Sequence, residues 1–273
     1  MNADYKSGVL ARRRALIALG NILDGAPSDE ALDALLTPEI AMRDRNLTWA
    51  LTMASLRNLY LLDAALDRFI ETRVDDLTRN ILRIGAVQLL YFDRIPPHAA
   101  VSTAVELAKT GGRARASGLV NAVLRKVSKI SPEGIELPEE PDRRISVEHS
   151  HPLWLVRRWI ERRGSDFAEA LASAGNVMPG LILRANARRI SRRKLAEKLK
   201  GEGIEVSELK KFPEYLHAEA PGHPSELPGF SEGLFSVQDP AFSFPVDLLG
   251  PQAGDRFVEF GCAPAGKLTH LAE

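Results

Sequence analysis

The sequence predicts a multidomain protein with an all-helical bundle, a small α+β segment, and the first strand and helix of a Rossmann-like fold. Three observations carry this prediction. Apolar residues recur with a helical period through residues 5–129, a stretch rich in proline and glutamate follows, and short strands then alternate with helices. We expect a helical domain at 1–130, a linker at 131–148, a middle domain at 149–232 and the start of a last domain at 233–273.

The expected helices of the first domain each carry an apolar stripe. A long helical run covers residues 41–70, with a break expected near Asp63. Residues 77–91 are apolar on nearly every side, which predicts a central, buried helix. Pro96 and Pro97 end that helix and start the next. The stripes of the other helices are Leu16, Leu19 and Leu23, then Val101, Ala104, Val105 and Ala108, then Leu119, Val120, Val123, Leu124 and Val127.

The middle of the chain changes character twice. Pro132, Pro138 and Pro141 stand among four glutamates and predict an extended linker. Strands that alternate with helices then indicate a small α+β unit. The expected helices lie near residues 153–160, 167–174 and 191–200, the last capped by Ser191, and the expected strands at 181–185, 204–206 and 234–238.

Composition bounds the class of protein. Of 273 residues, 45% are hydrophobic and 26% charged, as in ordinary globular domains. The formal net charge is zero, so any nucleic-acid surface has to come from local clustering of basic residues. One cysteine, Cys262, excludes an internal disulfide framework. The N-terminal residues lack the apolar core of a signal peptide. The most apolar stretch, Ile81 to Phe92, contains Arg83 and Gln88 and is too short to span a membrane. We therefore expect a cytoplasmic protein without membrane contact.

The last residues of the chain combine a strand, a turn of small residues and a helix start. Phe257, Val258 and Phe260 form the expected strand, and helix-forming sequence begins near Lys267. Such an arrangement presents backbone N–H groups to an anionic ligand group. The turn consists of Gly261, Cys262, Ala263, Pro264, Ala265, Gly266 and Lys267.

Three interpretations compete for this turn. A nucleotide P-loop is rejected because Leu268 follows Gly266 and Lys267, where Mg²⁺ binding requires Ser or Thr. A tight turn of an ordinary α/β protein also uses small residues. An S-adenosylmethionine loop needs an acidic residue near the strand end, here Glu259, and a turn that the methionine part of the cofactor can approach closely. Turn chemistry alone does not separate the last two, and the flanking sequence favours the cofactor loop.

The ending resembles the cofactor motif of the RsmB/NOP (Sun/Fmu) family of RNA cytosine-C5 methyltransferases, which typically shows D-x-C-A-A-P-G-G-K-T before a helix. The chain differs from that motif at Glu259, Gly261, Cys262, Ala265 and Leu268. The resemblance extends upstream in the same order as in the family. Residues 82–91, 97–109 and 118–125 resemble its NusB-type helical domain, and residues 150–154, 183–186 and 233–239 resemble its RNA-proximal middle segment.

The resemblance implies an enzyme that uses S-adenosylmethionine to methylate ribosomal RNA, with residues Gly261–Lys267 at the cofactor. The family uses a cysteine nucleophile and a second cysteine, both downstream of the turn. Cys262 lies inside the turn, so we expect no catalytic residue, weak or no cofactor binding and no activity in this chain. We interpret the chain as the N-terminal part of such an enzyme, truncated in the cofactor motif. A stand-alone NusB-like RNA- or protein-binding module is the alternative, although such a module would end near residue 130.

Basic residues supply the candidate RNA contacts. Arg12 and Arg13 are suggested by the resemblance to NusB, although a solvated helix face is the commoner role of a single charge run. Basic residues are also dense at 157–163 and 184–194, and phosphate binding needs such clusters. We hypothesise that residues 184–194 belong to an RNA-facing surface. Its candidates are Arg184, Arg188, Arg189, Arg192 and Arg193.

Other residues favour structural roles. Trp154 and Trp159 could stack on bases, but their spacing of five favours packing against separate neighbours. His149, His151 and His270 are not grouped as ligands, so no metal site is expected. One strand and one helix cannot cover both faces of a parallel sheet. We therefore expect residues 255–273 to be poorly ordered or to rest on the middle segment with exposed apolar surface. The sequence carries no prediction of the target nucleotide or the oligomeric state.

Overall fold

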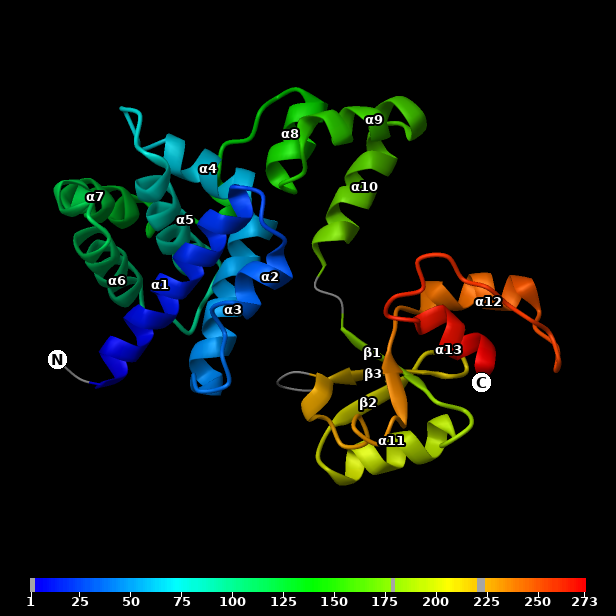
Figure 1. Ribbon diagram of the computed structural model, residues 1–273. Coiled ribbons are helices and arrows are strands. Elements are labelled where there is room, and N and C mark those ends of the chain that lie inside the picture. The colour runs from blue at the N-terminus through cyan, green and yellow to red at the C-terminus, as the bar shows by residue number, and fades with distance from the viewer. Residues whose placement is uncertain (1–2, 178–179, 220–223) are drawn as a thin grey trace. The chain divides into compact units, whose positions relative to one another are not determined.

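The chain divides into two compact units, Met1–Val177 and Met178–Glu273. The computed structural model describes residues 3–177, 180–219 and 224–273 (Figure 1). Helices dominate the first unit, and the second contains a small antiparallel sheet. Within these described ranges, no helix combines the length and the apolar character that crossing a membrane requires.

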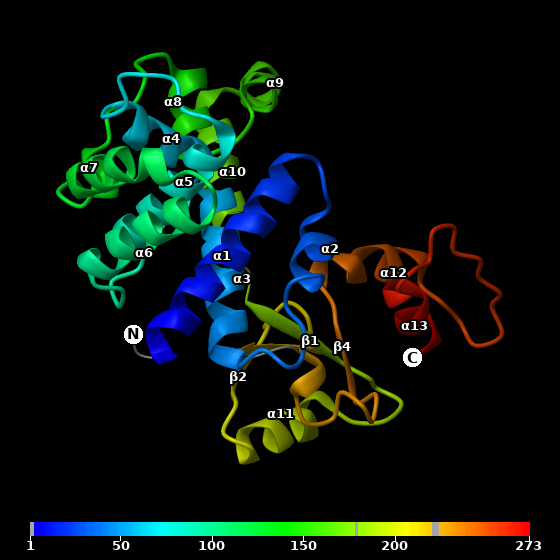
Figure 2. The same ribbon diagram turned by 60° about the vertical axis from the view of Figure 1, so that its left-hand side comes forward.

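The first unit is the helical bundle that the sequence predicts. Helix α5 lies at its centre, in contact with α1, α3, α4, α6 and α7 (Figures 1 and 2). Ile81, Leu82 and Ile84 of α5 are fully buried, which confirms the prediction of a central helix. The bounds are α1 Ala3–Leu23, α2 Ser28–Asp33, α3 Met42–Arg57, α4 Leu59–Asp67, α5 Asp76–Tyr91, α6 Pro97–Thr110 and α7 Ser117–Val127.

The long helical run expected at residues 41–70 breaks at Asn58 instead of near Asp63. The Asn58 side chain donates a hydrogen bond to the carbonyl oxygen of Ala54 at 2.9 Å, at the end of α3. An asparagine that bonds to nearby backbone competes with helix continuation. Asp63 lies inside α4, where its carboxylate pairs with Arg83 of α5 at 2.6 Å.

Residues 131–148 are not a continuous extended linker. A short 3₁₀ turn, Pro132–Gly134, precedes helix α8, Pro141–Glu148. Pro141 is the first residue of α8, a position where its missing N–H costs no helical hydrogen bond. Ile145 is fully buried and packs with residues of α9 (Leu153–Arg163) and α10 (Ser165–Asn176). Helices α8 to α10 therefore belong to the first compact unit, whose boundary lies after Val177.

The second unit is built on a four-stranded antiparallel sheet in the order β2-β3-β1-β4. Leu183 of β1 pairs with Leu216 of β3, and both pack against α11 on one face of the sheet (Figure 1). The Ser191 hydroxyl accepts a hydrogen bond from the Lys194 N–H, as expected for the cap of α11. The bounds are β1 Leu181–Ala185, α11 Arg192–Gly201, β2 Glu205–Glu208, β3 Tyr215–Glu219, β4 Phe235–Val237, α12 Ser243–Leu249 and α13 Gly266–Ala272, with 3₁₀ turns at Pro224–Glu226 and Pro240–Phe242. A further 3₁₀ turn, Ala114–Ala116, precedes α7 in the first unit.

Two features of this unit differ from the expectations. Strand β4 pairs with β1, so residues 235–237 complete the sheet of the middle unit and do not start another domain. Residues 256–260 form no strand. A strand exists through pairing with a neighbour, and none of the described strands lies beside this segment. Val258 and Phe260 are 83% and 95% exposed, as expected for a segment with exposed apolar surface.

Candidate nucleic-acid interface and cofactor turn

The proposed cofactor turn, Gly261–Lys267, leads directly into α13. Gly261 has a φ of +71°, and Ala265 has a φ of +67°, in the left-handed region that favours glycine. The resembled motif has glycine where this chain has Ala265. The backbone at Ala265 has the left-handed conformation that a glycine would adopt without strain. The Ala265 N–H donates to the carbonyl oxygen of Cys262, which closes the turn.

The side chains of the turn leave it open on one side. Cys262 is exposed, and a Cβ placed on Gly261 would meet no atom within 4 Å. Space beside the turn therefore permits a ligand to approach its backbone closely. On the inner side, a Cβ on Gly266 would lie 3.7 Å from the Gln238 side chain, so this glycine sits in ordinary contact with the sheet unit.

Lys267 and Glu259 form the charged pair of the turn. The Lys267 Nζ lies 2.9 Å from the Glu259 Oε1 and 5.4 Å from the centre of the Phe242 ring. The second carboxylate oxygen of Glu259 is buried and has no hydrogen-bond partner among the described residues. A buried acceptor without a partner is uncommon in folded proteins. Glu259 thus offers a hydrogen-bond acceptor next to the turn, which fits a ligand with hydroxyl or amino groups.

Arg184 is not an RNA-facing residue. Its side chain is fully buried, on the face of β1 opposite Leu183 and Ala185. The Arg184 Nε donates to the Gln238 Oε1 at 2.8 Å, Nη2 donates to the Thr269 hydroxyl at 3.1 Å, and Nη1 pairs with the Glu273 carboxylate. The guanidinium therefore links α13 and Glu273 to the sheet, and it is not accessible to a phosphate.

Arg12 is also wrongly predicted as an RNA contact. Its exposed fraction is 7%. The Arg12 Nε donates to the Gln88 Oε1 at 2.6 Å, and Nη1 donates to the Gly8 carbonyl oxygen at 3.0 Å, so the side chain joins α1 to α5. Arg13, in contrast, is exposed and borders a shallow groove between α1, α5 and α6.

The other four predicted RNA contacts lie at or near the surface of the second unit, and each has an internal partner. Surface ion pairs such as those of Arg192 and Arg193 contribute about 0–1 kcal/mol, and Arg188 and Arg189 bond only to backbone carbonyl oxygens, so phosphates can compete for these side chains. The partners are the Ala272 carbonyl oxygen for Arg188 (3.1 Å), the Glu232 carbonyl oxygen for Arg189, Glu208 for Arg192 (2.8 Å) and Glu197 for Arg193 (2.9 Å).

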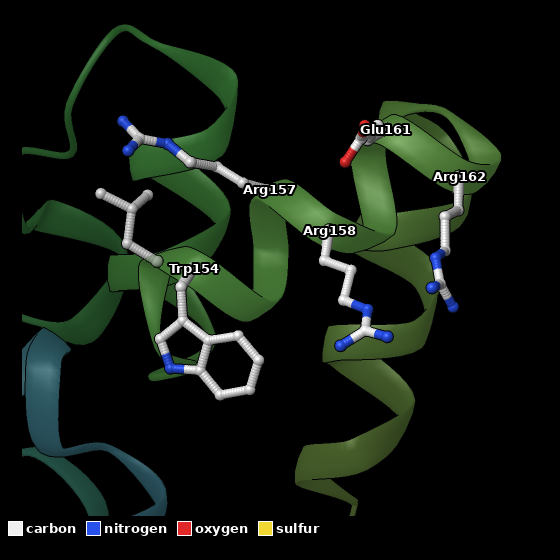
Figure 3. Close-up of a pocket in the computed structure, with 6 residues that line it drawn as sticks. Trp154, Arg157, Arg158, Glu161 and Arg162 are labelled. Carbon is white, nitrogen blue, oxygen red and sulfur yellow. The ribbon is translucent and has the colours of Figure 1, made fainter.

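Helix α9 carries a basic and aromatic face that the sequence reasoning did not select. Trp154 is 65% exposed, so the expectation that it packs against a neighbour is wrong. Arg158 and Arg162 are exposed and form no hydrogen bond or ion pair with any part of the chain that the structure describes. Figure 3 shows the side chains of Trp154, Arg158 and Arg162 extending to the same side of the helix. Their spacing of four residues is the sequence signal that places them on one face.

The remaining aromatic and basic residues of α9 have partners. Trp159 packs beside the buried cluster of Ile145 and lies 5.4 Å from the His151 ring, as expected for a packing residue. The Arg157 Nε pairs with Asp142 at 2.7 Å. The Arg163 guanidinium lies 5.1 Å from the centre of the Phe167 ring.

The structure also groups Glu148, His149 and Glu169, whose potential ligand atoms lie within 4.8 Å of one another. The sequence spacing did not indicate this grouping. Arg144 donates to Glu148 at 2.8 Å and to Glu169 at 2.7 Å. The hydrogen bond from Arg144 lowers the pKa of Glu169 from its usual value. The guanidinium already supplies the positive charge between the carboxylates, so this cluster is explained without a metal ion.

Comparison with known proteins identifies two domains in the chain. Residues 10–129 match the NusB family, and residues 151–223 match the ferredoxin-like domain described as Methyltr_RsmF/B-like. A crystal structure of PH0851 superposes with a TM-score of 0.69 at 20% identity, over 97% of this chain and 60% of that one. At this identity the likeness shows the fold alone.

Curated relatives match nearly the whole chain. A probable ribosomal RNA small subunit methyltransferase B of Synechocystis sp. is 31% identical over 272 residues, which are 97% of this chain and 61% of the relative. The ribosomal RNA small subunit methyltransferase B of Pseudomonas syringae pv. tomato is 33% identical over 265 residues, 96% of this chain and 58% of the relative. The chain therefore spans less than two thirds of the length of these relatives.

Proposed function

Because the chain belongs to the family of the ribosomal RNA small subunit methyltransferases B, we propose that it supplies the RNA-binding part and first cofactor loop of an S-adenosylmethionine-dependent rRNA (cytosine-C5) methyltransferase. The observation that carries this proposal is the order of the domains. A NusB domain, a ferredoxin-like domain and a turn that resembles the cofactor motif follow one another in a chain similar to these relatives over 97% of its length.

The proposal assigns the cofactor to Gly261–Lys267. S-Adenosylmethionine would supply the methyl group when bound. The turn backbone, open beside Gly261, would lie against the methionine part of the cofactor, and the unpartnered oxygen of Glu259 would accept a hydrogen bond from it. The Lys267 side chain is engaged by Glu259 and Phe242 and would orient that carboxylate, so Lys267 would contribute to the cofactor site through its backbone.

We also propose that this 273-residue polypeptide transfers no methyl group by itself. Methylation at C5 of cytosine needs a thiolate that adds to C6 and, in the family that the sequence resembles, a second cysteine that helps to release the product. The chain has one cysteine, Cys262, which lies in the cofactor turn. The role of this polypeptide by itself is therefore RNA binding. A ribosomal RNA target implies that the polypeptide acts in the cytoplasm.

We propose five arginines as phosphate contacts: the exposed Arg13 in the NusB domain, and the exposed Arg188, Arg189 and Arg193 and the half-buried Arg192 in the second unit. Their accessibility and weak internal partners support this assignment. Phosphate contacts make affinity fall with salt, with a slope of about 0.9 per contact on a duplex and about 0.7 on a single strand.

The test is binding of the purified chain to small-subunit ribosomal RNA over a range of salt concentrations. We expect the variants Arg188→Gln/Arg189→Gln and Arg192→Gln/Arg193→Gln each to lower the salt slope by about 1–2. Lys210→Gln/Lys211→Gln, an exposed pair in the same unit, is the matched control and should change it less. A wild-type chain without affinity for this RNA contradicts the proposed function.

A parallel assay with methyl-labelled S-adenosylmethionine tests the cofactor assignment. The chain alone should label no RNA, and any transfer of label contradicts the proposed inactivity. Equilibrium dialysis with the cofactor tests whether the turn binds it. Cofactor binding that is lost in Gly261→Val supports the methyltransferase part, because a side chain would fill the open side of the turn.

A further inference from the structure

We propose that the face of α9 formed by Trp154, Arg158 and Arg162 binds single-stranded RNA, with an unpaired base stacked on Trp154 and the phosphates on one side of that base on the two arginines. The inference takes its partner, RNA, from the proposed function and adds a site that is separate from the cofactor turn and from the arginines of the second unit.

The first support is the exposure of Trp154. Its indole is 65% exposed, compared with 41% for Trp49, while Trp159 on the same helix packs beside a buried cluster. A large aromatic side chain in water loses the stabilisation that burial would provide. Aromatic rings presented in this way are the platforms on which proteins stack unpaired bases.

The second support is the state of the neighbouring arginines. On the same helix, Arg157 pairs with Asp142 and Arg163 lies over the Phe167 ring, whereas Arg158 and Arg162 have no internal partner among the described residues. An unpaired guanidinium keeps all of its N–H donors for an incoming phosphate, which it can bind in bidentate fashion.

The third support is geometry. Trp154, Arg158 and Arg162 recur every four residues, so they follow one side of α9 and are about 6 Å apart along its axis. Figure 3 shows Arg157 and Glu161 directed away from that side. Arg157 and Glu161 also line the groove. The charge of Arg157 is balanced by Asp142, whereas Glu161 has no ion-pair partner among the described residues. Two unpaired positive charges against one carboxylate leave the groove complementary to a polyanion.

RNA fits this face better than a protein does. A protein interface gains most from a contiguous apolar centre, and charged residues are depleted there. Here a single ring stands at one end of a row of two guanidinium groups, which combines the stacking and phosphate contacts used for single strands. An RNA duplex stacks its bases internally and offers no free base face to the indole.

The experiment measures fluorescence anisotropy with the full chain and an unstructured RNA oligonucleotide rich in cytidine and uridine, with an RNA duplex of equal length for comparison. Trp154→Ala and Trp154→Leu should each weaken single-strand binding by about 5- to 150-fold, the range for loss of one stacked base. Trp154→Phe keeps an aromatic face and should lose much less. Duplex binding should be unchanged in all three variants.

The arginines give a second, independent readout. Arg158→Gln/Arg162→Gln should lower the salt slope of single-strand binding by about 1.4, two contacts at about 0.7 each. Trp154→Ala should leave that slope unchanged. The matched control is Arg157→Gln/Arg163→Gln on the same helix, where both side chains already have partners. Circular dichroism checks that the exposed substitutions leave the helices intact.

The outcomes separate this inference from the proposed function. If the wild-type chain binds no RNA, both fail. If it binds RNA but Trp154→Ala has wild-type affinity, or loses duplex binding equally, the stacking site is wrong and the proposed function stands. Arginine variants that match their control also overturn the site. If the α9 face binds a protein partner instead, the RNA affinity of the chain would be unchanged by every α9 variant.

Discussion

Ser150 caps a helix to which it does not belong. It has a φ of +53°, and its hydroxyl oxygen accepts hydrogen bonds from the N–H groups of Tyr60 at 3.1 Å and Leu61 at 3.4 Å. These groups are at the start of α4, where the N-cap residue Asn58 supplies no side-chain hydrogen bond. The left-handed backbone of Ser150 is thus the conformation in which its hydroxyl caps α4, and this is the only side-chain cap of α4 among the described residues.

We predict that Ser150→Ala destabilises the chain by about 0.5–2 kcal/mol, the usual effect of losing an N-cap. Ser150→Gly loses the same acceptor but adopts a positive φ without strain, so it should fall between alanine and wild type. Urea unfolding followed by circular dichroism measures the difference. A glycine variant that is less stable than the alanine variant would show that the backbone conformation is not strained.

Tyr215 illustrates how burial sets the pH range of stability. Its side chain is buried, its hydroxyl has no hydrogen-bond partner among the described residues, and burial raises its pKa to about 12. The folded state therefore favours the neutral phenol. This stability is fully present below the unfolded pKa of 10.0 and is lost as the pH rises toward about 12.

We predict that Tyr215→Phe makes stability less dependent on pH between about 10 and 12 and costs little at neutral pH, because no hydrogen bond is removed. Unfolding midpoints over this pH range test the prediction. Tyr91, whose pKa burial also raises to about 12, remains in the variant and accounts for part of the residual dependence. An unchanged pH profile would place the Tyr215 hydroxyl in contact with solvent.

At the scale of the elements, Gly85 sets how closely α5 and α7 approach. A Cβ at this position would lie 2.4 Å from the Leu124 Cδ1, inside the main core. We predict that Gly85→Ala destabilises the bundle by about 1–3 kcal/mol, since the overpacking outweighs the better helix propensity of alanine. Gly118, an exposed residue of α7 whose Cβ would meet nothing within 4 Å, is the matched control.

Gly118→Ala should leave stability unchanged or raise it by up to about 1 kcal/mol. Thermal unfolding of both variants gives the comparison. Equal effects of the two substitutions would mean that helix propensity, and not the contact between α5 and α7, determines the result at residue 85.

The elements that could be predicted from sequence are those whose signal is local. Helix α5 is apolar on nearly every side, and the Ser191 hydroxyl accepts a hydrogen bond from the Lys194 N–H three residues later in the sequence. Helix α8 was missed because Pro141 was interpreted as part of a linker. Proline also starts helices, and what stabilises α8 is the burial of Ile145 against residues of α9 and α10. Contacts of that kind are not visible in the local pattern.

The same reason applies to the candidate sites. Arg184 and Arg188 look alike in a basic stretch, and only the tertiary structure buries the first under α13 and leaves the second at the surface. Trp154 and Trp159 both fit a packing role by spacing, yet one is exposed. Charge density in sequence therefore locates a candidate region, and exposure and internal partners decide which of its side chains are available to RNA.

At the scale of the whole molecule, the two compact units have separate cores. The main core lies within α1 to α7, and the core of the sheet unit lies within residues 181–235. Ile145 of α8 packs with Val156 and Ala168 of the next helices, while α8 also contacts α4. Helices α8 to α10 thus form an extension of the first unit, and its natural end is Val177.

We predict that a fragment of residues 1–177 unfolds in one cooperative transition and is more stable than a fragment of residues 1–148. The shorter fragment keeps α8 but exposes Ile145, and losing the cover of one buried isoleucine removes about 1.5–3 kcal/mol. Urea unfolding of both fragments measures the difference, and Ile145→Ala in the longer fragment should lower its stability toward that of the shorter one. Two fragments of equal stability would mean that α9 and α10 contribute nothing to the first unit, and the boundary would then lie before α9.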